Sequence, residues 1–173
     1  MNTKVITGEV RFSYLNWAVP RLNELSQKNE YSTQIWISKK DKKTIALIEA
    51  AVVAATEKKW GATAPAKLKN PLRDGDEETT EKGVPVAPGF FFMNIRTDQK
   101  PGVVDADRQH LIEADDFVSG DYGRVSMTAY GYDQKGNRGV GFGWNNAQFL
   151  RKGDPLGSRV RAEDEFADGD DDI

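Results

Sequence analysis

The chain has 173 residues, 38% of them hydrophobic and 29% charged, which is enough for one domain with a sizeable buried core. It contains no cysteine, which excludes a disulfide framework and thiol chemistry and suits a reducing compartment. The N-terminal residues lead directly into a strand-like segment, and no stretch resembles a signal peptide or a membrane span. We therefore expect a soluble, non-secreted protein with no membrane partner.

The net charge of -3 conceals an uneven distribution of charge along the chain. Residues 163–172 include seven acidic residues and no basic one. The rest of the chain has 24 basic residues against 20 acidic ones, because this segment holds seven of the 27 acids. A basic body with an acidic tail is typical of proteins whose tails take part in interactions. We therefore divide the chain into a domain over residues 1–161 and a disordered acidic tail over residues 162–173.

Alternating side chains predict strands over residues 7–17 and 31–38. In the first strand Val10, Phe12 and Tyr14 share one face, and Pro20 is expected to end it. In the second strand Trp36 lies on the polar side, among serine and glutamine. The polar stretch over residues 21–30 between them is predicted to be a loop or a short helical turn.

An amphipathic helix is predicted after the second strand. Asp41 is its expected N-cap, and Ile45, Ile48, Val52 and Ala55 recur at helical spacing up to residue 58. Such a helix is suited to closing one end of a barrel. Residues 60–88 are rich in alanine, proline and glycine and include a run of acids, which predicts a long surface loop.

Residues 89–97 read GFFFMNIRT and predict the strand around which the rest is organised. One face carries Phe91, Met93 and Ile95, which is an ordinary core face. The other face carries two phenylalanines, an asparagine and an arginine. Flat rings beside a guanidinium suit a ligand with apolar bases and a negative backbone, as single-stranded nucleic acid has. Burial of these rings under a second layer is the structural alternative.

A hairpin of two strands, over residues 122–132 and 139–150, is predicted in the C-terminal half, with a turn at residues 133–137. The first strand has tyrosines and a central arginine on one face. The second alternates Gly139, Gly141 and Gly143 with large apolar residues, which indicates close approach by a ligand or another backbone. Asn145 and Asn146 are expected to form a bulge that turns Ala147 inward.

These elements predict a mainly β fold: a five-stranded OB-type barrel with one capping α-helix and long loops, with a β-sandwich as the alternative. Rings and basic side chains recur on the polar strand faces, which predicts single-stranded DNA as the partner. The stacking candidates are Trp36, Phe90, Phe92, Tyr122, Tyr130 and Tyr132. The phosphate-binding candidates are Arg11, Lys39, Lys40, Arg96, Arg124, Lys135 and Arg138.

Catalytic signatures are absent from the sequence: it has no Walker loop, no nucleophile elbow and no metal motif. We therefore expect no enzymatic activity, no cofactor and no metal. Two other functions stay open. The first is a non-catalytic adaptor whose barrel face is an oligomer interface. The second is a metal-dependent nuclease that would use acids between the central strand and the hairpin, namely Asp105, Asp107, Glu113, Asp115 and Asp116.

Five segments of the C-terminal half resemble a family of tailed-phage single-stranded DNA-binding proteins with the OB fold, of the kind that enterobacterial phages encode. They are residues 101–105 (PGVVD), 118–125 (VSGDYGRV), 130–133 (YGYD), 136–146 (GNRGVGFGWNN) and 153–157 (GDPLG). The resemblance implies a protein of the host cytoplasm that coats exposed strands in DNA replication, recombination and repair. It also implies an acidic tail that docks phage or host replication proteins, although here the last aromatic is Phe166 and the chain ends in Asp172-Ile173. The oligomeric state is left open.

Overall fold

Eight strands and one α-helix make up the part of the chain that the computed structural model describes, residues 2–156 and Phe166. The elements are β1 (Lys4–Ile6), β2 (Val10–Asn23), β3 (Lys28–Ser38), α1 (Lys42–Trp60), the 3₁₀ helix η1 (Gly61–Thr63), β4 (Arg73–Asp74), β5 (Phe90–Thr97), β6 (Gly102–Val104), the 3₁₀ helix η2 (Ala114–Asp116), β7 (Tyr122–Gln134) and β8 (Asn137–Arg151). The predicted acidic tail, Phe166 apart, lies outside the described residues, as does its boundary at residue 161.

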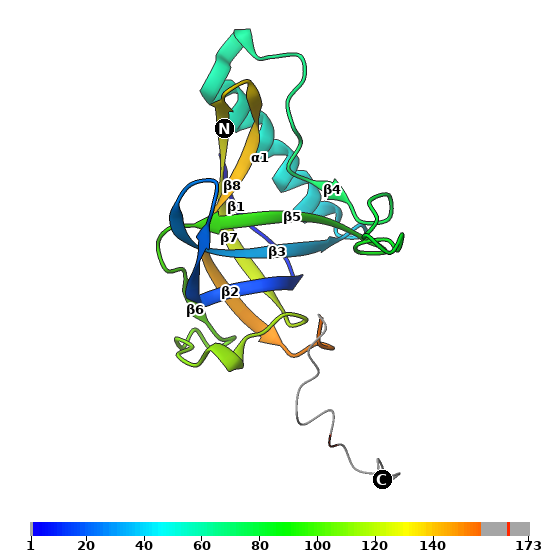
Figure 1. The fold of residues 1–173 in the computed structure, drawn as a ribbon, viewed down its shortest axis with the longest axis vertical. Helices are drawn as coiled ribbons and strands as arrows, with labels where there is room; N and C mark the ends of the chain where they lie inside the picture. The colour runs from blue at the N-terminus through cyan, green and yellow to red at the C-terminus, as the bar shows by residue number, and fades with distance from the viewer. Residues whose placement is uncertain (1, 157–165, 167–173) are drawn as a thin grey trace.

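Five of these strands close into a ring in the order β2-β3-β5-β8-β7 and back to β2. Two joins are short: β5 meets β8 in parallel at Arg96 and Gly143, and β2 meets β7 through Val10 and Arg11. A ring of five strands with short joins is the partly open barrel of the OB fold, so the predicted fold class is confirmed. In Figure 1, β2, β3 and β5 run side by side across the front, and β7 and β8 pass behind them.

The interior of the ring is filled by the inward faces of its strands. Phe12, Ile35, Met93, Ile95 and Met127 are all buried there. Strand side chains alternate between the two faces of a sheet, so the neighbours of these residues along each strand point outward. The outward faces of β3 and β5 are therefore the polar and aromatic ones that the sequence predicts.

Helix α1 covers part of the ring and packs mainly against β7. The side chain of Asp41 accepts a hydrogen bond from the Thr44 N–H at 3.1 Å, so the predicted N-cap is confirmed. The helix buries Ile48, Ala51 and Ala55, and it ends at Trp60 because Gly61 takes φ +59°. Among the described residues no helix combines the length and the apolar character needed to cross a membrane.

The loop predicted over residues 21–30 is wrong, because β2 and β3 continue through it as a long hairpin. The strand passes Pro20 because the pairing is irregular between Asn16 and Arg21, so the ladder needs no N–H at that position. A second irregularity follows Ser13 and places Tyr14 at φ +48° with 72% of its surface exposed. Tyr14 therefore does not share the buried face of Phe12, as the alternation predicted.

The bulge predicted at Asn145 and Asn146 is confirmed. The register with β7 shifts there, so that Ser126 pairs with Asn146 while Met127 pairs with Trp144. The shift turns Ala147 into the core, where it is 4% exposed.

Candidate nucleic-acid interface

The outer face of β3 and β5 carries the residues that the sequence assigns to DNA. Four register pairs cross it: Ser38–Phe90, Trp36–Phe92, Gln34–Asn94 and Ser32–Arg96. The ring centroids of Trp36 and Phe90 lie 5.6 Å apart in a tilted arrangement, and both side chains are partly exposed. In the OB fold, the face formed by the second and third strands of the barrel binds oligonucleotides, and here those strands are β3 and β5.

A line of arginines and aromatic rings extends this face across six strands. We call it the arginine–aromatic ladder, and its members are successive cross-strand partners. In order they are Arg73, Phe92, Trp36, Arg11, Tyr122 and Arg151.

Each guanidinium of the ladder lies against a ring. The Arg73 carbon Cζ is 4.8 Å from the Phe92 centroid, and that of Arg151 is 3.8 Å from Tyr122. Arg11 lies between two rings, 5.8 Å from Trp36 and 5.3 Å from Tyr122. Arginine over an aromatic face is attractive and keeps both groups in place. The ladder therefore alternates π-faces with positive charge, which is the composition of a surface that binds single-stranded nucleic acid.

The protein itself orients the guanidiniums. Arg11 donates to the carbonyl oxygens of Gly120 at 3.1 Å and Asp154 at 2.6 Å. Arg73 forms an ion pair with Glu78, and Arg151 forms one with Glu9. The pKa values of Arg73 and Arg151 are raised by these hydrogen bonds to carboxylates. All three side chains are thus held before any ligand arrives.

A buried carboxylate fixes the end of the ladder where β7 begins and β8 ends. Asp121 is 0% exposed and accepts backbone N–H groups from Val118 at 2.9 Å and Gly153 at 3.2 Å. It also accepts from the Lys152 ammonium at 3.0 Å. Because Tyr122 follows it directly, this network positions the last ring of the ladder.

A short acidic segment over residues 73–78, which we call the acidic strap, lies against the other end of the ladder. It contains β4, which pairs with β5 beside Phe92. Lys39 binds the strap through Asp74 and Asp76, each at 2.7 Å. Hydrogen bonds to Asp74 and then Asp76 raise the pKa of Lys39, and the same bonds from Lys39 lower the pKa values of both acids. Protonation of the acids would release Lys39 only as the pH falls through those lowered pKa values. At neutral pH the strap therefore stays bound to Lys39.

Neutralising the strap is expected to raise affinity for single-stranded DNA. The triple variant Asp74→Asn, Asp76→Asn and Glu78→Gln removes three negative charges and releases Lys39 and Arg73 for phosphates. Each new phosphate contact should steepen the slope of log K against log salt by about 0.7. Titrations at several salt concentrations measure both changes.

The matched control is Glu77→Gln with Glu81→Gln. These two acids belong to the same loop, and within the described residues neither one pairs with Lys39 or Arg73. An equal gain from the control would show that the strap acts through general charge alone.

Comparison with known proteins identifies the family of the chain. A family model described as "Enterobacter phage Enc34, ssDNA-binding protein" matches residues 3–173. The chain belongs to this family. No curated protein matches the sequence.

Solved structures share the fold of the chain. The single-stranded DNA-binding protein from bacteriophage Enc34, solved in complex with ssDNA, has a TM-score of 0.77 at 16% identity, with 90% of each chain covered. Gp2.5, a single-stranded DNA-binding protein encoded by bacteriophage T7, has a TM-score of 0.61 at 12% identity, with 100% of this chain and 99% of that one covered. At these identities the likeness establishes the fold alone.

The other predicted site residues fall into two groups. Lys40 and Arg96 are exposed at the ends of β3 and β5, close in sequence to the ladder. Arg124 lies on β7, where its Nε donates to the carbonyl oxygen of Thr7 at 2.8 Å. The second group belongs to the β7–β8 hairpin and contains Tyr130, Tyr132, Lys135 and Arg138, the last in an ion pair with Asp133. The second group therefore lies at the opposite end of β7 from Tyr122, the ladder residue on that strand.

The glycine pattern of β8 has an intramolecular explanation. A Cβ at Gly139 would lie 2.7 Å from the Tyr132 hydroxyl, and one at Gly141 would lie 2.9 Å from the Tyr130 ring. The two tyrosines therefore fill the space above these glycines. At Gly139 the predicted approach of another backbone is confirmed, because Lys69 pairs with it in parallel and the Lys69 N–H donates to the carbonyl oxygen of Arg138 at 3.1 Å. At Gly141 the approaching group is instead the Tyr130 side chain of the neighbouring strand.

Three residues near the site were not predicted from the sequence. Arg73 lies on a strand of two residues, which has no periodicity to detect, and Arg151 reads as the start of the tail. Tyr14 is exposed at positive φ, a conformation that is unfavourable for a tyrosine by about 1–2 kcal/mol. Strained residues of this kind cluster at functional sites, which makes Tyr14 a further candidate stacking ring on β2.

The acids proposed for a nuclease do not form a metal site. In residues 2–156 and at Phe166 no group of three or more histidine, cysteine, aspartate or glutamate side chains could hold a metal ion. Asp105 instead accepts hydrogen bonds from the backbone N–H groups of Asp107 and Gln109, at 2.9 and 3.0 Å, and so shapes its own loop.

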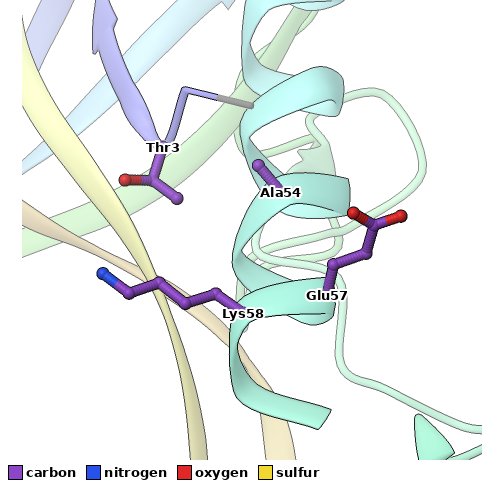
Figure 2. Close-up of a pocket in the computed structure, with 4 residues that line it drawn as sticks. All are labelled: Thr3, Ala54, Glu57 and Lys58. Atoms are coloured by element: carbon purple, nitrogen blue, oxygen red, sulfur yellow. The ribbon is translucent and has the colours of Figure 1, made fainter. Parts of the chain in front are cut away.

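A hollow elsewhere is lined by Thr3, Ala54, Glu57 and Lys58, and its two charged side chains point away from each other (Figure 2). Neither place offers convergent polar groups for catalysis.

Proposed function

We propose that this chain is a sequence-tolerant, non-catalytic single-stranded DNA-binding protein that coats exposed strands during phage DNA replication, recombination and repair in the host cytoplasm. The arginine–aromatic ladder carries the proposal. Bases stack on the partly exposed rings of Trp36, Phe90 and Tyr122, since every base has a π-face. Arg96, Lys40 and the guanidiniums of the ladder meet the phosphates. Duplex DNA is disfavoured because its stacked and paired bases hide the faces that these rings would use.

Fluorescence anisotropy tests this function. A labelled mixed-sequence single strand is titrated with the full chain and competed with the same sequence as duplex, over a series of salt concentrations. We expect binding that weakens with salt and that duplex does not compete away. Equal affinity for both forms, or no affinity for either, would contradict the proposal and favour the adaptor function.

The acidic tail is proposed to compete with DNA for the ladder and to recruit replication proteins when DNA displaces it. The geometry of the described residues allows this, because β8 ends at Arg151, which is itself a member of the ladder. Residues up to Leu156 are held by hydrogen bonds, and from Leu156 to the last acid, Asp172, the chain spans at most about 55 Å when extended. The ladder crosses six strands and is therefore about 24 Å long. Acids of the tail can thus reach every member of the ladder.

Deleting residues 163–173 is expected to raise affinity for single strands, most strongly at low salt, where charge interactions are least screened. The comparison variant keeps the length and replaces the seven acids by asparagine and glutamine. It should bind as tightly as the deletion if charge is the cause. Unchanged or weaker binding by both variants would exclude the competition.

A further inference from the structure

Three polar side chains form a directed hydrogen-bonded chain on the outer face of β3 and β5. The indole N–H of Trp36 donates to Oε1 of Gln34 at 2.9 Å. Nε2 of Gln34 in turn donates to Oδ1 of Asn94 at 3.4 Å. An indole nitrogen can only donate, so the atom of Gln34 that faces it must be the oxygen. The direction of the whole chain is therefore set by Trp36.

The chain ends in a donor that faces solvent. Gln34 is 8% exposed and lies between its partners Ser13 on β2 and Asn94 on β5, so its amide has little freedom to turn over. Asn94 is exposed, and its oxygen is engaged by Gln34. Within residues 2–156 the Nδ2 group of Asn94 donates to no protein acceptor. The outward end thus presents two N–H donors next to the stacking rings.

Donors at this position select among bases by the acceptors on their edges. Every base carries an acceptor, but adenine offers only ring nitrogens, whereas thymine carries two carbonyl oxygens and cytosine and guanine carry one each. We infer that Asn94 is a base-reading residue beside the stacking ring of Trp36, and that the site favours bases with carbonyl oxygens, thymine most and adenine least. The inference rests on the proposed function and adds a specificity to it. One hydrogen bond of this kind changes affinity about two- to tenfold.

The test compares wild type with Asn94→Ala on labelled oligo-dT and oligo-dA of one length, each short enough to bind one protein. Oligo-dA stacks on itself, so the absolute preference is not the readout. The readout is the change in the dA/dT ratio of Kd between the two proteins, because self-stacking of the strand is the same for both. We expect the ratio to fall about two- to tenfold in Asn94→Ala.

Two further measurements separate base reading from other roles. Asn145→Ala removes an exposed amide that donates to Thr128 on β7, and it should leave the ratio unchanged. Trp36→Phe removes the N–H that orients Gln34, so the ratio should fall there too, which a purely structural role of Asn94 would not produce. In wild type, a strand whose thymines are replaced by difluorotoluene isosteres, which keep the shape but lack the carbonyls, should bind about two- to tenfold more weakly than oligo-dT.

Three outcomes would overturn the inference. The ratio could be unaltered in Asn94→Ala, which would remove any base reading. Affinity for both strands could fall equally, which would make Asn94 a phosphate contact. The isostere could bind as well as thymine, which would leave shape alone as the cause. Failure of wild type to bind either strand would instead contradict the proposed function itself.

Discussion

Replacing Trp36 by alanine is expected to weaken single-strand binding by about 1–3 kcal/mol, or roughly 5- to 150-fold. Trp36 is the central ring of the ladder, partly exposed, with Phe90 beside it and Arg11 against its face. Its loss removes a stacking platform and one of the two rings against which Arg11 lies. Trp36→Phe keeps a ring and should recover part of the loss. Anisotropy titration at fixed salt measures both variants.

Two comparisons decide what a Trp36→Ala result means. Denaturant unfolding must show that the variant is folded under the binding conditions. Tyr130→Ala removes a ring that is 41% exposed on the hairpin surface. A loss of the same size there would extend the DNA path along β7, whereas no loss would confine it to the ladder. Full affinity in Trp36→Ala would contradict stacking at the centre of the ladder.

The outer face of β5 could be predicted from sequence because a strand has a period of two. Phe90, Phe92, Asn94 and Arg96 share a face whatever the rest of the chain does. Asp41 was equally predictable, since the capping interaction is local. Period and capping need no knowledge of tertiary structure, which explains why these predictions are confirmed.

The ladder could not be predicted as a unit, because it depends on contacts between distant parts of the chain. Arg11 and Tyr122 are brought together by two short pairings of β2 with β7, and no local pattern encodes that join. Tyr14 leaves the predicted face because one extra residue is inserted opposite β3. Alternation also cannot tell whether an outward residue stays exposed, because a later segment can cover it.

Phe92 shows the consequence of such a cover, and Phe92→Ala is expected to lower the free energy of unfolding by about 3–5 kcal/mol. The side chain of Phe92 points away from the barrel interior, yet it is only 1% exposed, because the Arg73 guanidinium of β4 lies against it. Its direct partner across the sheet is Trp36, which is expected to act in binding and not mainly in stability. Substitution of Phe92 should therefore mainly lower stability, whereas substitution of its cross-strand partner Trp36 should mainly weaken binding.

Urea unfolding of Phe92→Ala, with Phe92→Leu as the milder substitution, measures this difference. Phe92→Leu keeps most of the buried volume and should cost less than the alanine variant. Binding by Phe92→Leu, measured where it is fully folded, should stay closer to wild type than binding by Trp36→Ala, because a ring that is only 1% exposed offers no face to a base. A stable Phe92→Ala that has lost DNA affinity would mean that the strap opens and Phe92 itself stacks. In that case the acidic strap would be a gate on the ladder, and neutralising it should strengthen binding only while Phe92 is present.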